Sequence, residues 1–151
     1  MPCLICERIQ MIQQAANEYF VRELETGYVV IGDHQHFKGY TLFLCKSHVT
    51  ELHFLSKEQR TQHLAELALV YEAVYNAFKP AKMNCELLGN GDAHLHWHLF
   101  PRNENDMPQR GPVWWLPKDE MYSDAKRPSH EELSDMKERL SQEIDRLLQA
   151  E

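Results

Sequence analysis

The chain has 151 residues, with 16 Lys and Arg against 23 Asp and Glu, and its formal net charge is −7. That length fits a single domain over residues 1–151, with a core large enough to need no disulfide bridges. The acidic balance argues against general nucleic-acid or membrane-surface binding. With no signal-peptide pattern and no membrane-spanning apolar stretch, we expect a cytoplasmic protein that binds neither membrane nor nucleic acid.

Four cysteines are present, and we expect them to be reduced thiols or metal ligands in a cytoplasmic chain. Cys3 and Cys6 form a C-x-x-C pair near the N-terminus. Cys45 and Cys85 alternate with strand residues, a pattern typical of packed thiols.

The first half of the chain reads as a helix followed by short strands. Residues 7–20 support an amphipathic helix, and residues 19–24 and 28–33 form a hairpin across a Thr-Gly turn. A third strand is predicted over residues 39–45.

A long helix is the clearest predicted element. Ser56 and Gln59 make a capping box, and apolar residues recur at helical spacing until Lys79-Pro80 ends the helix after Phe78. Strands over 82–88 and 94–100 follow, and their short Gly-Asn-Gly-Asp connection predicts antiparallel neighbours.

The C-terminal third has a different character. Residues 103–128 contain four prolines and read as a long irregular loop, and Ser129 with Glu132 caps a charged helix that ends near residue 149. Taken together, the elements predict an α+β fold.

The segment HLHWHLF, residues 94–100, places His94, His96 and His98 at alternate positions. On a strand this spacing directs all three imidazoles to one face and Leu95, Trp97 and Leu99 to the other. Positions four apart lie roughly 13 Å apart along a strand, too far for all three histidines to share one tetrahedral ion. At least one histidine must therefore have another role.

The same segment resembles the H-φ-H-φ-H-φ-φ signature of the histidine triad (HIT) superfamily, and the following Pro-Arg is similar to its hydrolase branch. CLIC near the N-terminus and GYTLFLCKSHVTELHFL in the middle resemble landmarks of bacterial members, so the resemblance covers residues 3–102. It implies a five-stranded antiparallel sheet with a long helix packed on it, followed here by the C-terminal helix. It also implies a homodimer.

The resemblance further implies a zinc site of Cys3, Cys6, His48 and His94, with His53 as an alternative to His48. Two thiolates and two imidazoles would close the tetrahedron, so the Zn²⁺ would be structural.

The resemblance also implies that His96 is the nucleophile, which attacks the α-phosphorus of a nucleotide and forms a nucleotidyl-imidazole. A hydrogen bond from its other ring nitrogen to a carbonyl would fix the tautomer. His98 would lie near the phosphate or leaving group, where a protonated imidazole neutralises charge or donates a proton, although a purely orienting role is an alternative.

Four residues are candidate substrate contacts. Where the family has G-Q-[ST]-V, this chain has LGNGDAH, in which Asn90 replaces the missing donors or is simply a turn residue. Asp33 resembles the residue that accepts hydrogen bonds from ribose hydroxyls, and an ordinary turn aspartate is the alternative. Asn84 and Arg102 are phosphate-side candidates, and a surface charge is equally consistent for Arg102.

Other conspicuous residues receive less definite predictions. Trp114 and Trp115 could cover a base, lie in a dimer interface or anchor the loop to the core. Four further histidines are expected to face solvent or make local hydrogen bonds, with no functional role: His34, His36, His63 and His130.

These observations predict a nucleotide hydrolase that releases a nucleoside monophosphate from a dinucleoside polyphosphate or a nucleoside phosphoramidate. One alternative is a nucleotidyltransferase to a sugar phosphate, although that branch usually lacks the third histidine. A second is a zinc-stabilised nucleotide-binding module without turnover. A third is a metallohydrolase with His94 and His96 at an open metal site, which would leave the cysteines without a purpose.

Overall fold

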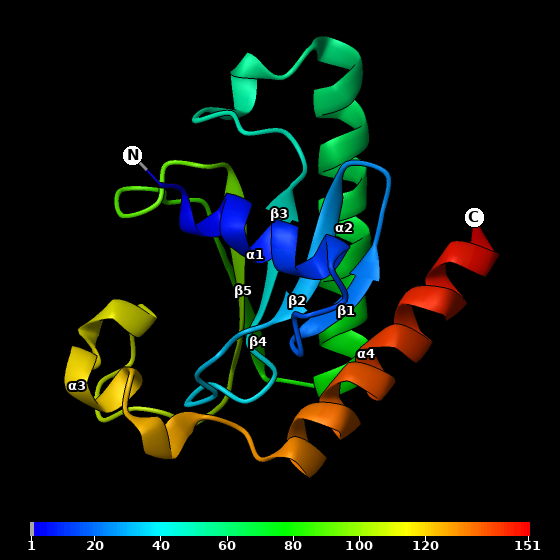
Figure 1. Ribbon diagram of the computed structural model, residues 1–151. Helices are drawn as coiled ribbons and strands as arrows, with labels where there is room; N and C mark the ends of the chain where they lie inside the picture. Colours follow the sequence, from blue (N-terminus) through cyan, green and yellow to red (C-terminus); the bar gives the residue numbers. More distant parts are fainter. Residues whose placement is uncertain (1) are drawn as a thin grey trace.

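A single antiparallel sheet of five strands forms the centre of the computed structural model, which describes residues 2–151 (Figure 1). The strands lie in the order β1-β2-β3-β5-β4, and every neighbouring pair is antiparallel. The predicted α+β fold is confirmed. The strand bounds are β1 Phe20–Glu23, β2 Gly27–Ile31, β3 Thr41–Cys45, β4 Lys82–Glu86 and β5 His96–Arg102.

Four α-helices accompany the sheet: α1 Leu4–Gln13, α2 Lys57–Phe78, α3 Lys118–Met121 and α4 His130–Ala150. Both predicted capping boxes are present, at Ser56 for α2 and at Ser129 for α4. Helix α1 begins three residues earlier than predicted, because the Cys3 thiol accepts a hydrogen bond from the Cys6 amide and caps it. No helix within residues 2–151 combines the length and apolarity needed to cross a bilayer.

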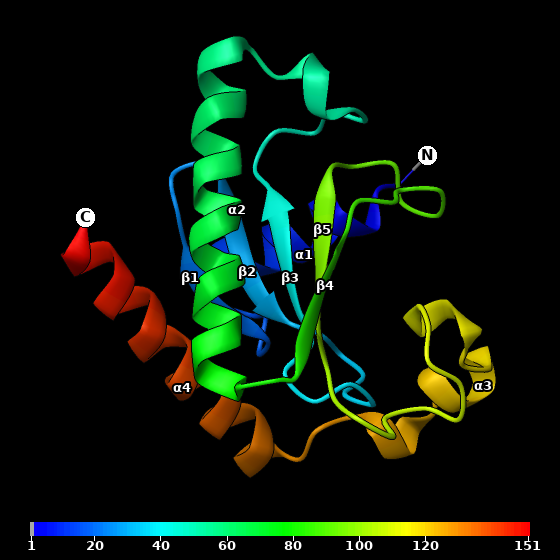
Figure 2. The ribbon, with the colours of Figure 1, turned by 180° about the vertical axis from the view of Figure 1, so that it is seen from behind.

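The two long helices cover one face of the sheet (Figure 2). Trp97 and Leu99 of β5 point to this face, where they join a core that includes Val70 and Val74 of α2 and Leu140 of α4. The opposite face is covered at one end by α1, whose Ile5 and Ile9 pack on residues of β2 and β3.

The segment 103–128, predicted to be irregular, contains α3 and two short 3₁₀ turns, Val113–Trp115 and Asp124–Lys126. It packs Val113, Leu116 and Met121 around Phe37 and Phe100, and so extends the core on the side of the sheet that faces α1. The single turns were missed because they are held by contacts to distant residues rather than by a repeating apolar pattern. The face of β5 that carries His96 and His98 lies between segment 103–128 and α1, which both line the cavity beside these histidines.

Candidate active site and metal centre

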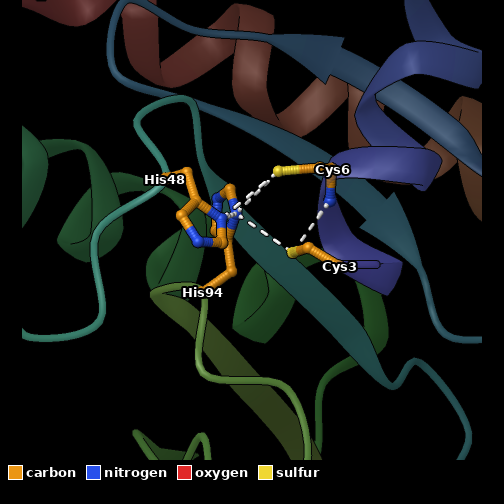
Figure 3. A group of neighbouring side chains, drawn as sticks. All are labelled: Cys3, Cys6, His48 and His94. Carbon is orange, nitrogen blue, oxygen red and sulfur yellow. Dashed lines mark hydrogen bonds between the residues drawn. The ribbon is translucent and has the colours of Figure 1, made fainter. Parts of the chain in front are cut away.

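The four predicted zinc ligands meet in one cluster (Figure 3). Cys3 and Cys6 come from the start of α1, His48 from the turn after β3, and His94 from the residues just before β5. Their ligand atoms all lie within 4.8 Å of one another. The cluster contains His48, so the alternative His53 is not needed to complete the set.

The spacing of the ligand atoms fits a tetrahedral ion. The Cys6 Sγ atom lies 3.3 Å from His48 Nδ1 and 3.4 Å from His94 Nδ1, and the two Nδ1 atoms are 3.1 Å apart. Zinc bond lengths in a regular tetrahedron require sulfur–nitrogen edges of about 3.6 Å and nitrogen–nitrogen edges of about 3.3 Å. The four residues therefore form a metal-binding cluster that suits Zn²⁺.

A hydrogen bond outside the cluster holds His94 in the tautomer that a metal ligand needs. Its Nε2 lies 2.6 Å from the Cys45 carbonyl oxygen, which can only accept, so Nε2 carries the proton and Nδ1 presents its lone pair to the cluster. Burial lowers the pKa of His94, with the Cys45 hydrogen bond acting in the opposite direction, and the lower pKa favours the neutral, ligating form.

His96 is the first residue of β5 and points away from the helix-covered face. Its Nδ1 donates to the His94 carbonyl oxygen at 2.6 Å, which is the tautomer-fixing hydrogen bond expected from the sequence. The Nε2 atom is consequently unprotonated and has a free lone pair. The His94 backbone thus connects the metal cluster directly to the candidate nucleophile.

His98 lies next to His96, with ring centroids 4.9 Å apart. Its Nδ1 is 2.7 Å from the Tyr40 hydroxyl, and its ring lies nearly parallel to the rings of Tyr40 and Phe100, with centroids 6.0 and 5.9 Å away. Burial, and secondarily repulsion by His96, lowers the pKa of His98 to about 4. The free protein therefore holds a neutral His98 at pH 7 rather than the protonated imidazole we expected, and offers an N–H instead of a full positive charge.

A cavity of about 300 Å³ opens beside these two histidines. Leu4, Ile5 and Arg8 of α1 line one side, and Leu42, Leu44 and Tyr122 contribute apolar and aromatic surface elsewhere. The volume lies at the lower end of the range for small-molecule sites. Both His96 and His98 line the cavity, so a small molecule bound in it would lie against the two imidazoles.

Asp33 lies in the same cavity, after the end of β2. The Arg8 guanidinium donates to its carboxylate at 3.0 Å, and both side chains are about three-tenths exposed. Arg8 was not identified from the sequence, because a lone arginine on a helix carries no local signal of its distant partner.

Asn84 and Arg102 lie elsewhere. They line a separate groove between β4 and the segment that follows β5. There Arg102 donates to both carboxylate oxygens of Asp106, to the Asn84 amide oxygen and to the Gly111 carbonyl. These contacts occupy the guanidinium, so the structure does not bring either residue to His96. Asn90 is exposed in the loop between β4 and β5.

His63 is placed differently from the prediction of a solvent-facing or locally bonded side chain. It is fully buried on the helix side of the sheet, and its Nε2 accepts a hydrogen bond of 2.9 Å from the Trp97 indole. Its Nδ1 lies 2.8 Å from the Thr26 hydroxyl, which in turn donates to Glu66. Trp97 lies between His96 and His98 in the sequence, so this network anchors β5 on its helix-covered face, opposite to these two histidines.

The remaining predicted residues lie as follows. Cys45 is buried and Cys85 is half-buried, and desolvation raises the pKa of both thiols, to about 11 for Cys85. The His34 ring contacts Tyr122 edge to face, and His36 Nε2 donates to the Asp106 carbonyl. His130 is exposed at the start of α4.

Comparison with known proteins identifies the family. The HIT domain model matches residues 13–105, more than half of the chain, so the chain belongs to the HIT family. Both cysteines of the metal cluster lie before this matched region. No curated protein matches the chain significantly.

Solved structures of histidine triad proteins share this fold. One from Marinobacter aquaeolei VT8 is 24% identical, with a TM-score of 0.73, and the match covers 90% of this chain and 95% of that chain. A Zn-bound family protein from Mycobacterium smegmatis is 18% identical, with a TM-score of 0.68 and coverage of 100% and 99%. A hypothetical histidine triad nucleotide-binding protein from Sulfolobus tokodaii is 20% identical, with a TM-score of 0.71 and coverage of 94% and 93%.

Proposed function

We propose that this HIT protein hydrolyses nucleotide conjugates at the α-phosphorus through a covalent intermediate on His96, releasing a nucleoside monophosphate. The substrate classes are dinucleoside polyphosphates and nucleoside phosphoramidates. Membership of the HIT family supports a nucleotide as ligand, as does the likeness to the hypothetical nucleotide-binding protein from Sulfolobus tokodaii. The proposal takes residues 1–151 as one domain that acts in the cytoplasm as a homodimer.

One observation supports this function most directly. The hydrogen bond from His96 Nδ1 to the His94 carbonyl leaves the Nε2 lone pair available on a residue that lines the 300 Å³ cavity. A nucleophile requires such an unprotonated nitrogen held in one orientation. A protein that only bound nucleotides would not need this arrangement.

The reaction proceeds in two displacements. His96 Nε2 attacks the α-phosphorus, a P–N bond forms, and the bond to the leaving group breaks with its electron pair going to the leaving atom. The neutral His98 donates a hydrogen bond to that atom as charge develops. Water then attacks the phosphorus, the P–N bond breaks, and His96 returns to its neutral form with a proton released.

Asp33 has a separate part in the proposal. As a carboxylate oriented by Arg8 at the far end of the cavity, it accepts hydrogen bonds from the ribose hydroxyls. Zinc held by Cys3, Cys6, His48 and His94 would supply structural stability only, because all four positions of the tetrahedron are taken by protein ligands.

Substituting His96 tests the function. The His96→Ala variant should lose several powers of ten in turnover, because no other side chain can form the intermediate, while nucleotide affinity should change by about tenfold or less. Acid quench with α-phosphate-labelled substrate should trap label on the wild-type protein in an acid-labile, base-stable bond.

His130→Ala is the matched control, since it removes an exposed histidine on α4. Its turnover and labelling should equal those of the wild type. Label retained in the His96→Ala protein would identify a different nucleophile, and nucleotide binding without any turnover would show a binding module instead.

A further inference from the structure

The order of strands sets a direction across the candidate site. Asp33 follows β2, His96 and His98 lie on β5, and β4 lies beyond β5 at the edge of the sheet. The 300 Å³ cavity is lined from α1, β2, β3, β5, Tyr122 and the loop that holds Asp92, and no β4 residue contributes to it. A nucleotide with its ribose at Asp33 and its phosphorus at His96 therefore directs its leaving group past His98, toward β4.

Two side chains lie on that far side of His98. Glu86 of β4 is its cross-strand partner, so their Cβ atoms project from the same face of the sheet about 5 Å apart. The Trp114 ring contacts His98 edge to face, with centroids 5.9 Å apart, and its Nε1 donates to the Glu86 carboxylate at 2.5 Å. The indole is 40% exposed, so part of its surface remains open.

The Glu86 carboxylate on the β4 side of His98 has no cationic partner among the described residues. The side-chain partner of Glu86 is a neutral indole, and across residues 2–151 Glu86 forms no ion pair. Asp33, at the ribose end, is by contrast paired with Arg8. The side of His98 toward β4 thus presents the Glu86 carboxylate and the Trp114 ring.

We propose that Trp114 and Glu86 form a leaving-group subsite that selects a positively charged amine. An aromatic ring and a carboxylate together attract an ammonium group, whereas the same carboxylate repels a phosphate. The inference rests on the proposed function and specifies its substrate as the phosphoramidate of a diamine-like compound. The P–N bond to the near nitrogen breaks, that nitrogen leaves with the electron pair and takes a proton from solvent water, and the distal ammonium stays intact.

A matched pair of substrates tests the charge preference. Adenosine 5′-phosphoramidates of butane-1,4-diamine and of pentylamine have the same length and differ only in a terminal ammonium or methyl group. For the zinc-loaded wild-type protein, kcat/KM should be about threefold to tenfold higher for the diamine compound, as expected for a partly exposed charge pair.

Glu86→Gln should reduce that ratio to about one, chiefly by lowering kcat/KM for the diamine compound. The amide keeps an oxygen that can accept the Trp114 hydrogen bond, so the indole stays in place. Trp114→Leu should lower kcat/KM for both compounds. Trp115→Leu is the control, because Trp115 is 59% exposed and packs over Gly111 rather than against His98.

Equal kcat/KM values in the wild type, or an unchanged ratio in Glu86→Gln, would overturn the subsite. In either case, turnover of the pentylamine compound that disappears in His96→Ala would leave the proposed function intact. Turnover of neither compound would overturn the subsite, and hydrolysis of a dinucleoside polyphosphate that disappears in His96→Ala would then leave the proposed function intact.

Discussion

Replacing Trp97 by phenylalanine should destabilise the protein by about 3 kcal/mol, although the residue lies on the face of β5 opposite to the candidate catalytic histidines. Trp97 is 8% exposed, and its indole N–H donates at 2.9 Å to Nε2 of a fully buried His63. Phenylalanine would keep a six-membered ring in the core and remove the donor.

Two contributions make up this value. His63 Nε2 would be left without a partner in an environment closed to water, at a cost of about 1–3 kcal/mol. Loss of the pyrrole portion adds roughly 1 kcal/mol of lost packing. In a protein of this length about 3 kcal/mol corresponds to a decrease in Tm of roughly 6–12 °C.

Thermal unfolding followed by far-UV circular dichroism measures the effect, on zinc-loaded protein so that metal occupancy is constant. Trp115→Phe is the matched control and should change the free energy of unfolding by less than about 0.5 kcal/mol, because that side chain is exposed. Equal changes in the two variants would show that the Trp97–His63 hydrogen bond does not stabilise this core.

Three further outcomes are expected. Purified protein should contain about one zinc per chain by elemental analysis. Cys3→Ser or Cys6→Ser should lower Tm clearly, with a smaller effect on turnover per folded molecule. Full zinc occupancy after loss of both thiols would rule out this ligand set. Arg102→Met should lower the free energy of unfolding, measured by chemical denaturation, by roughly 3 kcal/mol or more, because the Arg102 guanidinium is bound by Asp106. The KM for the nucleotide should stay unchanged, and a large increase in KM would restore Arg102 as a phosphate contact. Burial lowers the pKa of His63, so stability should decrease as pH falls below about 6.5, where the unfolded state takes up the proton first; an NMR titration giving a pKa above 6.5 would contradict this.

Local patterns in the sequence predicted much of the fold. The alternation at residues 94–100 placed His96 and His98 on one face of a strand and Trp97 on the other, as the structure shows. Capping boxes set the starts of both long helices. These signals are reliable because strand alternation and helix capping depend on residues at most four positions apart.

The zinc cluster was predicted by another route. Composition alone did not decide whether the cysteines are reduced thiols or metal ligands. The family resemblance selected Cys3, Cys6, His48 and His94 as the ligand set. The structure brings these four together from three separate elements. It also shows how the Cys45 carbonyl fixes the His94 tautomer, which no sequence motif encodes.

Tertiary structure alone decided the partners of the individual polar groups. Arg102 follows the triad directly, yet its guanidinium binds Asp106 and Asn84 instead of lining the cavity with His96. Trp114 contacts His98 across 16 positions of sequence, and the hydrogen bond between Trp97 and His63 spans 34. The periodicity of a segment fixes the direction in which a side chain points, but its partner there depends on how separate elements pack, and that is settled only when the whole core forms.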